Sequence, residues 1–179
     1  MSLRKDCFTC AQELRGTALP PRERIAADDH WRVAHATGTA LPGWLVLVPR
    51  RHVTAVWELT DAEAESLGSW QVRLSRALRE VVGCPKTYVA QFAEAEGYAH
   101  VHFHVVPRDR ELPEELRGPG VFGQLNRPAE EWVPDDRADL LAESLGLALS
   151  LDGLSAELLG ADDPEGWEGP AGRDGSGRG

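Results

Sequence analysis

Three of the six histidines of this chain stand at alternate positions of one short segment. Residues 100–108 read His-Val-His-Phe-His-Val-Val-Pro-Arg, so that His100, His102 and His104 alternate with apolar residues. This alternation predicts a strand whose apolar side chains face a core while the three imidazoles share the opposite face. Neutral imidazole can ligate a metal ion, move a proton or attack phosphorus, and we therefore expect the chemistry of the protein to lie here.

Two cysteines near the N-terminus form the second candidate site. Cys7 and Cys10 have the spacing at which two thiolates reach one tetrahedral Zn²⁺ ion. Two neutral imidazoles would complete the site, and His52 and His100 are the candidates because each belongs to an apolar strand or its end. A thioredoxin-like redox pair would need a strand before it and a long helix after it, and neither pattern is present. These four residues predict a structural zinc site.

The histidine segment allows two mechanisms. In one, His100, His102 and a third histidine bind a catalytic zinc ion whose open position activates water. In the other, an imidazole is itself the nucleophile and its neighbours hold the phosphate. The second is favoured because His100, once it joins the cysteines, makes a closed site and leaves His102 neutral and aimed at the substrate. His104 and Arg108 can then donate hydrogen bonds to phosphate oxygens.

The composition limits the class of protein and of partner. A chain of 179 residues with 42% hydrophobic residues can build the core of one domain, with or without an appendage. A net charge of −10 excludes a general basic surface for nucleic acid or for a membrane. No apolar run is long enough to cross a bilayer, and residues 1–6 do not read as a secretory signal, so we expect a cytoplasmic protein. Three cysteines, two of them in the tight pair, fit a reducing compartment.

Four arginines lie close in sequence to the candidate histidines, although the chain as a whole is acidic. Arg50 and Arg51 precede His52, and Arg108 and Arg110 follow the histidine segment. If these two places meet in space, they form a small basic site for an anionic substrate such as a phosphate ester. The alternative is that they are ordinary solvated arginines.

The elements that position these residues predict an α+β fold. A long helix is expected to begin after Thr60, with Glu63 completing a capping box, and to end at Gly83. A turn at residues 94–97 would make the histidine strand the second half of an antiparallel hairpin. Strands are expected at residues 31–36, 44–48, 87–93 and 98–106, and a second helix at residues 136–151.

The chain divides into three stretches. Residues 1–110 hold the candidate site residues and are expected to form the catalytic domain. Residues 111–159 are expected to be a C-terminal extension whose helix packs on that domain. Residues 160–179 are rich in Gly, Asp and Pro, which predicts a disordered tail.

Three blocks of the sequence resemble the histidine triad (HIT) family. Residues 100–106 match its motif of three histidines that alternate with apolar residues, and the Pro-Arg that follows is also common there. Residues 41–52 resemble an upstream block in which a strand runs into proline, basic residues and histidine. Cys7 and Cys10 match the zinc-binding pair of many bacterial members and of the related galactose-1-phosphate uridylyltransferases.

This resemblance implies a HIT-like fold, with an antiparallel sheet of about five strands that is usually shared across a homodimer. It implies that His102 attacks the α-phosphate of a nucleotide ester, anhydride or phosphoramidate, and that water or another acceptor resolves the nucleotidyl-histidine. His104 would contact the phosphate. A zinc hydrolase with metal-activated water and a non-catalytic nucleotide-binding protein are the alternatives. The zinc ligands implied by the family are Cys7, Cys10, His52 and His100.

Three positions depart from the family pattern. Trp44 stands where many members have a histidine, and Ala36 stands where an acid commonly holds the ribose hydroxyls. The serine near the triad that often contacts phosphate is replaced around Gly97. We therefore expect an intact nucleophile with altered ribose recognition, and a pocket to which residues 109–134 and the C-terminal helix contribute.

Overall fold

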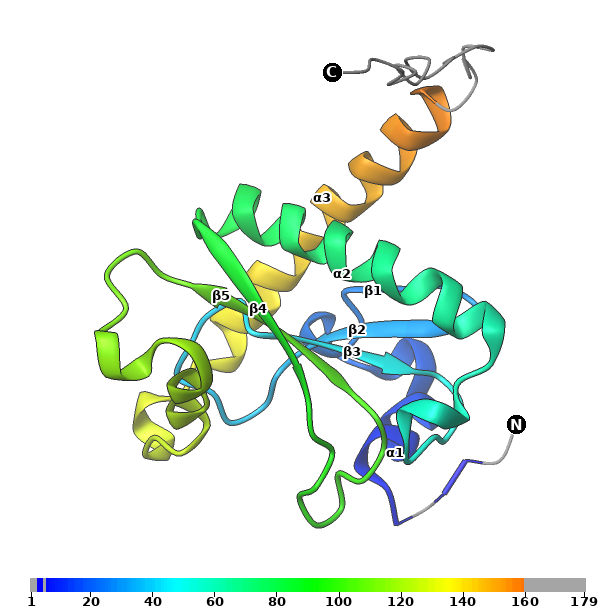
Figure 1. The fold of residues 1–179 in the computed structure, drawn as a ribbon, viewed down its shortest axis with the longest axis horizontal. Coiled ribbons are helices and arrows are strands. Elements are labelled where there is room, and N and C mark those ends of the chain that lie inside the picture. The colour runs from blue at the N-terminus through cyan, green and yellow to red at the C-terminus, as the bar shows by residue number, and fades with distance from the viewer. Residues whose placement is uncertain (1–2, 5, 160–179) are drawn as a thin grey trace, which may run out of the picture.

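Five antiparallel strands form one sheet in the order β1-β2-β3-β5-β4. The computed structural model describes residues 3–4 and 6–159, and the tail expected at residues 160–179 lies outside them. The expected α+β fold is confirmed, and β3 lies at the centre of the sheet between β2 and β5 (Figure 1). The strands are β1 (Ala26–Ala27), β2 (Trp31–His35), β3 (Leu45–Pro49), β4 (Lys86–Gln91) and β5 (Phe103–Arg108).

Three α-helices accompany the sheet within the described residues: α1 (Phe8–Arg15), α2 (Asp61–Val81) and α3 (Asp135–Leu159). The expected start of α2 is confirmed, because the Glu63 N–H donates to Thr60 Oγ1 (3.3 Å) and the Thr60 N–H donates to Glu63 Oε2 (2.7 Å). Both helices α2 and α3 lie on the same side of the sheet (Figure 1). None of the described helices combines the length and the apolar character that a membrane span requires.

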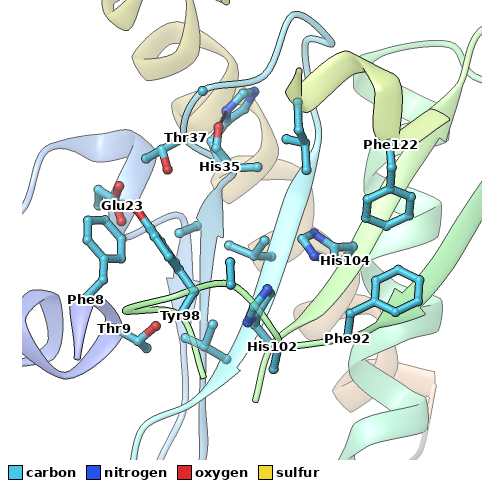
Figure 2. Close-up of a pocket in the computed structure, with 18 of the residues that line it drawn as sticks. Phe8, Thr9, Glu23, His35, Thr37, Phe92, Tyr98, His102, His104 and Phe122 are labelled. Atoms are coloured by element: carbon cyan, nitrogen blue, oxygen red, sulfur yellow. Dashed lines mark hydrogen bonds between the residues drawn. The ribbon is translucent and has the colours of Figure 1, made fainter. Parts of the chain in front are cut away.

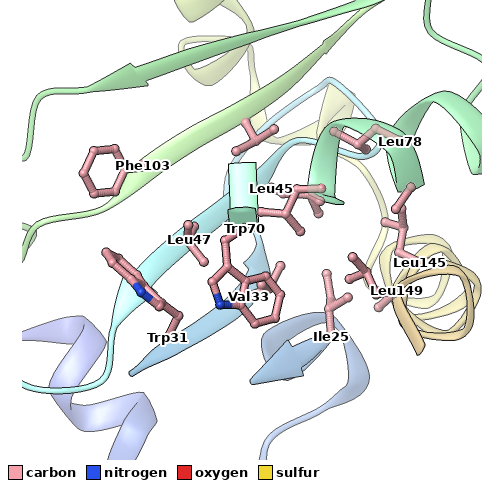
Figure 3. Packing of buried hydrophobic residues seen from close by; sticks show 14 of the residues in the cluster. Ile25, Trp31, Val33, Leu45, Leu47, Trp70, Leu78, Phe103, Leu145 and Leu149 are labelled. Carbon is pink, nitrogen blue, oxygen red and sulfur yellow. The ribbon is translucent and has the colours of Figure 1, made fainter. Parts of the chain in front are cut away.

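Alternation along the strands gives the sheet two different faces. One set of side chains packs under α2 and α3 to form the main core, which Figure 3 shows from close by. The intervening residues face the other side, where the candidate site lies. The main core includes Trp31, Val33, Leu45, Leu47, Phe103 and Val105 from the strands, Trp70, Leu74 and Leu78 from α2, and Leu145 and Leu149 from α3.

The histidine segment begins differently from the expected strand. The antiparallel pairing of β4 with β5 is present, but β5 begins at Phe103 and not at residue 98. The reason is that β4 pairs no further than Gln91, which lies opposite Phe103. Ahead of β5 the chain is held elsewhere, because the Val101 N–H donates to the Val53 carbonyl (2.7 Å). Residues 92–102 therefore form a long connection, and of the three histidines only His104 lies in the strand.

Ion pairs fasten α1 to the sheet. Glu13 accepts hydrogen bonds from Nε of Arg32 on β2 (3.1 Å) and from Nε of Arg50 beyond β3 (2.6 Å). Arg32 also donates to the backbone carbonyl of Glu23 (2.6 Å). The side chains of Glu13 and Arg32 are only 9% and 7% exposed, so removing either would take one partner away from a nearly buried charge. This network holds the cysteine-bearing helix against the sheet.

Because one face of α3 packs in the core, replacing two of its leucines by alanine should have very different effects on the free energy of unfolding. Leu145 is fully buried, whereas Leu147 is 63% exposed. Leu145→Ala should lower the free energy of unfolding by about 2–5 kcal/mol, since it removes buried methyl groups and leaves a cavity. Leu147→Ala is the matched control and should change it by less than about 0.5 kcal/mol. Urea unfolding measures both values, and equal values would show that α3 does not belong to the core.

Candidate active site

Distant parts of the chain bring the cysteine pair and two histidines together. Cys7 is the N-cap residue of α1, Cys10 lies in that helix, His52 follows β3, and His100 precedes β5. Nδ1 of His100 lies 3.6 Å from Sγ of each cysteine, and Nδ1 of His52 lies 3.3 Å from Sγ of Cys10. The four ligand atoms all lie within 4.8 Å of one another, so the predicted residues form a cluster that could hold a metal ion.

The chemistry of this cluster fits zinc. In a tetrahedral site with Zn–S of about 2.3 Å and Zn–N of about 2.0–2.1 Å, sulfur and nitrogen lie about 3.5 Å apart, close to the separations found here. His100 Nε2 lies 2.9 Å from the Pro49 carbonyl, which can only accept, so Nε2 carries the proton and Nδ1 presents its lone pair to the sulfurs. Burial lowers the pKa of His100 to about 4, which keeps the ring neutral and able to ligate.

A cavity of about 710 Å³ lies on the sheet face opposite α2 and α3. The strands provide its floor, and α1, the connection 92–102 and the segment after β5 provide its walls. Both His102 and His104 line it (Figure 2). The other lining residues include Phe8, Thr9, Glu23, Arg32, Ala34, His35, Ala36, Val46, Val48, Phe92, Glu94, Tyr98, Phe122, Leu125 and Trp132.

His102 is oriented by the backbone carbonyl of His100, a member of the Cys/His cluster. Its Nδ1 lies 2.8 Å from the carbonyl oxygen of His100, and a carbonyl can only accept. Nδ1 therefore carries a proton, and in the neutral ring the lone pair is on Nε2. No hydrogen bond from the described residues reaches Nε2. His102 thus presents an unprotonated nitrogen on a ring that lines the cavity.

His104 lies deeper in the same cavity and is only 8% exposed. Its Nδ1 lies 3.0 Å from Nε1 of the buried Trp44, and its ring meets those of Trp44 and Phe122 edge-on, with centroids 5.6 and 5.2 Å away. Burial, with a smaller effect of nearby His102, lowers the pKa of His104 to about 4. The imidazole is therefore neutral at neutral pH.

His35 also lines the cavity, but both of its ring nitrogens are used by the backbone. Nδ1 lies 2.8 Å from the Ala36 carbonyl, and the Gly43 N–H donates to Nε2 (3.1 Å). Burial lowers the pKa of His35, so its ring is neutral. We conclude that His35 shapes the floor and leaves no ring nitrogen for a ligand.

Aromatic side chains stand on both sides of the histidines. Phe8 packs against Tyr98 with ring centroids 5.1 Å apart, and Phe92 packs against Phe122 at the same separation. Figure 2 shows these two pairs on opposite sides of His102. None of the four was predicted as a site residue, because an apolar pattern does not distinguish an aromatic side chain that packs in the core from one that lines a cavity. Phe92 and Tyr98 fall within the expected strands 87–93 and 98–106, and Phe8 is the first residue of α1.

The basic site, one of the two alternatives that the sequence left open, does not form at Arg50 and Arg51. Arg50 pairs with Glu13 (2.6 Å), and Arg51 pairs with Glu63 (2.7 Å), the capping-box acid of α2. Neither arginine lines the cavity. Each has a carboxylate partner that is nearly buried, and spacing along the chain does not reveal such a partner. Arg32 does line the cavity, but two glutamates hold it.

Arg108, expected to contact phosphate, does not line the cavity either. A strand advances about 3.3 Å per residue, which places Arg108 roughly 13 Å beyond His104. Val106 lies between them in a second apolar cluster with Leu112 and Val121, which closes this end of the sheet face. The geometry removes Arg108 from the predicted phosphate contacts and leaves His102 and His104.

A family profile for the HIT domain matches residues 20–111, more than half of the chain. The chain belongs to the HIT family. No curated protein matches this HIT sequence. The sequence resemblance to the family is thus confirmed, over a region that contains β1 to β5 and both cavity histidines of the triad.

Solved structures of histidine triad proteins share the fold of this HIT protein. A zinc-bound family member from Mycobacterium smegmatis superimposes with a TM-score of 0.62 at 19% identity, over 83% of this chain and 96% of that one. A hypothetical histidine triad nucleotide-binding protein from Sulfolobus tokodaii has a TM-score of 0.62 at 14% identity, over 81% and 93%. A histidine triad protein from Bradyrhizobium japonicum has a TM-score of 0.58 at 22% identity, over 70% and 89%.

The three departures from the HIT pattern fall at different places in the site. Ala36 lines the cavity, and Trp44 lies against His104. Gly97 lies in the connection 92–102 with a φ of +80°, and a Cβ there would meet nothing within 4 Å. Ala36 thus affects the cavity directly, and Trp44 affects it through His104.

Acid should destabilise this HIT protein through His104. Its pKa is about 4 in the folded protein, against about 6.5 for an exposed imidazole. Between these two pKa values the unfolded state binds a proton that His104 in the folded protein does not. The neutral His104 therefore costs no stability above pH 6.5, and the free energy of unfolding falls by up to about 3 kcal/mol as the pH drops toward 4. Urea unfolding at several pH values should show a smaller fall for His104→Gln than for wild type. Equal pH dependence of the two proteins would contradict the lowered pKa of His104.

Proposed function

We propose that this protein is a nucleotide hydrolase or nucleotidyl transferase in which His102 attacks the α-phosphate of a nucleotide ester, anhydride or phosphoramidate. The observation that carries the proposal is the contact of His102 Nδ1 with the His100 carbonyl, which leaves Nε2 as the nucleophile. Members of the HIT family are generally nucleotide hydrolases or transferases, and the match of residues 20–111 supports the same class of activity here.

The proposed reaction has two displacement steps. Nε2 of His102 forms a bond to the α-phosphorus while the bond to the leaving group breaks, and the leaving group departs with the electron pair. Water or another acceptor then attacks the phosphorus and gives its proton to the solvent, while the bond between phosphorus and Nε2 breaks and its electron pair returns to His102. His104, 4.8 Å from His102 between ring centroids, is placed to donate a hydrogen bond to a phosphate oxygen.

The charge of the cavity supports an α-phosphate as the target. Its arginine, Arg32, is held by two glutamates, and both Glu23 and Glu94 line the cavity. A phosphorus that bears both a nucleoside and a leaving group carries one negative charge, whereas a terminal phosphate carries about 1.5 to 2. The single charge is easier to place in this cavity. The aromatic pairs offer surfaces on which a base can stack.

We also propose that Cys7, Cys10, His52 and His100 hold a structural zinc ion. Four protein ligands complete a tetrahedral shell, whereas a catalytic zinc site keeps one position open for water. When bound, the ion would cross-link α1 to the segment after β3, through His52, and to the segment before β5, through His100. The protein itself supplies the reacting groups. The zinc-bound Mycobacterium smegmatis protein supports this choice of metal. These points favour the histidine nucleophile over metal-activated water.

A homodimer in a reducing cytoplasm completes the proposal. β4 is an edge strand of the sheet, and Val89 on it is 47% exposed. Val72 on the neighbouring α2 is 50% exposed. Pairing of two such edges would continue the sheet across a twofold axis. Cys7, Cys10 and Cys84 form no disulfide, which fits a reducing compartment.

The covalent intermediate provides the direct test of the nucleophile. Mixing wild type with a nucleoside phosphoramidate and quenching in alkaline denaturant should give a mass increase of one nucleotidyl group. His102→Ala should give no adduct and should lose at least about 10³-fold in kcat, because the covalent route is removed. His30→Gln, a change outside the cavity, is the matched control and should keep the adduct.

Other outcomes of this experiment would identify the alternatives. Turnover that chelation abolishes, with no adduct at any time, would indicate metal-activated water. Nucleotide binding without turnover of esters, anhydrides or phosphoramidates would indicate a non-catalytic binding protein. Either result would contradict the proposed mechanism.

Metal analysis tests the zinc site independently of activity. Wild type should carry about one zinc ion per chain, and the Cys7→Ser/Cys10→Ser variant should carry almost none and unfold at a lower temperature, because metal binding contributes to folding. Cys84→Ser is the matched control, since Cys84 is also buried but lies outside the cluster. Equal zinc content in wild type and the double variant would rule the site out.

A further inference from the structure

The two cavity histidines have hydrogen-bond partners of opposite kinds. His102 Nδ1 faces the His100 carbonyl, which can only accept a hydrogen bond (2.8 Å). His104 Nδ1 faces the indole nitrogen of Trp44, which can only donate one (3.0 Å). The first partner requires a proton on Nδ1, and the second requires a lone pair there. The two partners therefore favour opposite tautomers, with the proton on Nδ1 in His102 and on Nε2 in His104.

The contact with Trp44 determines where His104 carries its proton. The ring is neutral, because burial lowers its pKa to about 4. A neutral imidazole with an unprotonated Nδ1 must carry its one proton on Nε2. His104 is thus a donor at Nε2, next to a His102 ring whose Nε2 is unprotonated. One cavity wall presents a nucleophile and a hydrogen-bond donor side by side.

Trp44 is itself held firmly in place. Its side chain is fully buried, its carbonyl accepts from the Ala36 N–H (2.8 Å), and its ring meets Phe122 edge-on. The preceding Gly43 has a φ of +81°, and a Cβ at that position would lie 2.9 Å from Cγ2 of Val82. This turn fits glycine and directs the indole beneath His104. Trp44 therefore has little freedom to move away from His104.

We propose that Trp44 is a positioning residue that fixes His104 in the Nε2–H tautomer and directs this N–H toward a phosphate oxygen at His102. The proposal rests on the function proposed above and adds a residue that acts through His104. An indole N–H cannot reverse its role, so it also prevents Nδ1 of His104 from taking up a proton. His104 then acts as a fixed donor and not as a proton relay.

Nitrogen NMR of the histidine rings tests the tautomer without any substrate. In wild type, Nδ1 of His104 should appear unprotonated and Nε2 protonated, while His102 should show the reverse pattern in the same spectrum. Trp44→Phe keeps an aromatic ring but removes the donor, and His104 should then populate both tautomers. A protonated Nδ1 on wild-type His104, or an unchanged spectrum in Trp44→Phe, would overturn the proposal.

Kinetics of two variants separate the hydrogen bond from the packing. Trp44→Phe should lower kcat about 10- to 100-fold with little change in KM, because a donor to the developing charge is no longer oriented. In Trp44→His, the imidazole ring superposes on the five-membered ring of indole, so its Nε2–H can replace the lost donor. We expect this variant to restore most of kcat, although it loses the larger part of the buried ring and is less stable.

The matched control is Trp70→Phe, which removes a buried indole whose N–H donates to Asp28 Oδ2 (2.7 Å), far from the cavity. It should leave kcat and the His104 spectrum unchanged. Wild-type kcat in Trp44→Phe, or no rescue by Trp44→His, would overturn the positioning role. If wild type turned over no nucleotide, the proposed function would fail, and the NMR spectra alone would decide whether Trp44 fixes the tautomer.

Discussion

One residue, His100, makes the contacts on which the rest of the site depends. Its Nδ1 faces the two cysteine sulfurs, its Nε2–H meets the Pro49 carbonyl at the end of β3, and its own carbonyl accepts from His102. The side chain therefore belongs to the Cys/His cluster while the backbone orients His102, the proposed nucleophile. Because residues 100–102 are not in the sheet, this is the constraint that keeps His102 in a single orientation.

The alternation of side chains along the strands separates the core from the cavity. Alternate residues of β2, β3 and β5 enter the core beneath α2 and α3, and the residues between them form the cavity floor. A substitution on one face thus leaves the other face largely intact. α1 is held to the cavity side by Glu13, whose carboxylate binds Arg32 and Arg50, and the proposed zinc ion would add a second attachment through Cys7 and Cys10. The two attachments would support each other.

Short motifs predicted the residues of the Cys/His cluster, although the chain brings them together from distant segments. The spacing of Cys7 and Cys10 and the need for two imidazoles point to His52 and His100 without tertiary information. The sequence left the role of Arg51 open, because nothing in it shows that Glu63 both completes the capping box of α2 and pairs with Arg51. The strand was expected to begin at residue 98 because alternation continues there, but a strand also needs a neighbour, and β4 ends at Gln91. The wall from Phe122 to Trp132 has no periodicity to read.

If this acidic protein binds a nucleotide as proposed, its cavity must hold the phosphate through hydrogen-bond donors and not through net positive charge. Burial makes His104 a neutral group with a pKa of about 4, so it offers a hydrogen bond and no cation. In a largely apolar cavity such a bond is stronger than in water, because the surroundings screen it poorly. A fixed donor that matches charge developing at phosphorus stabilises the transition state more than the ground state. The absence of a free arginine among the cavity-lining residues is therefore consistent with catalysis, since a strong cation would also hold the released nucleotide.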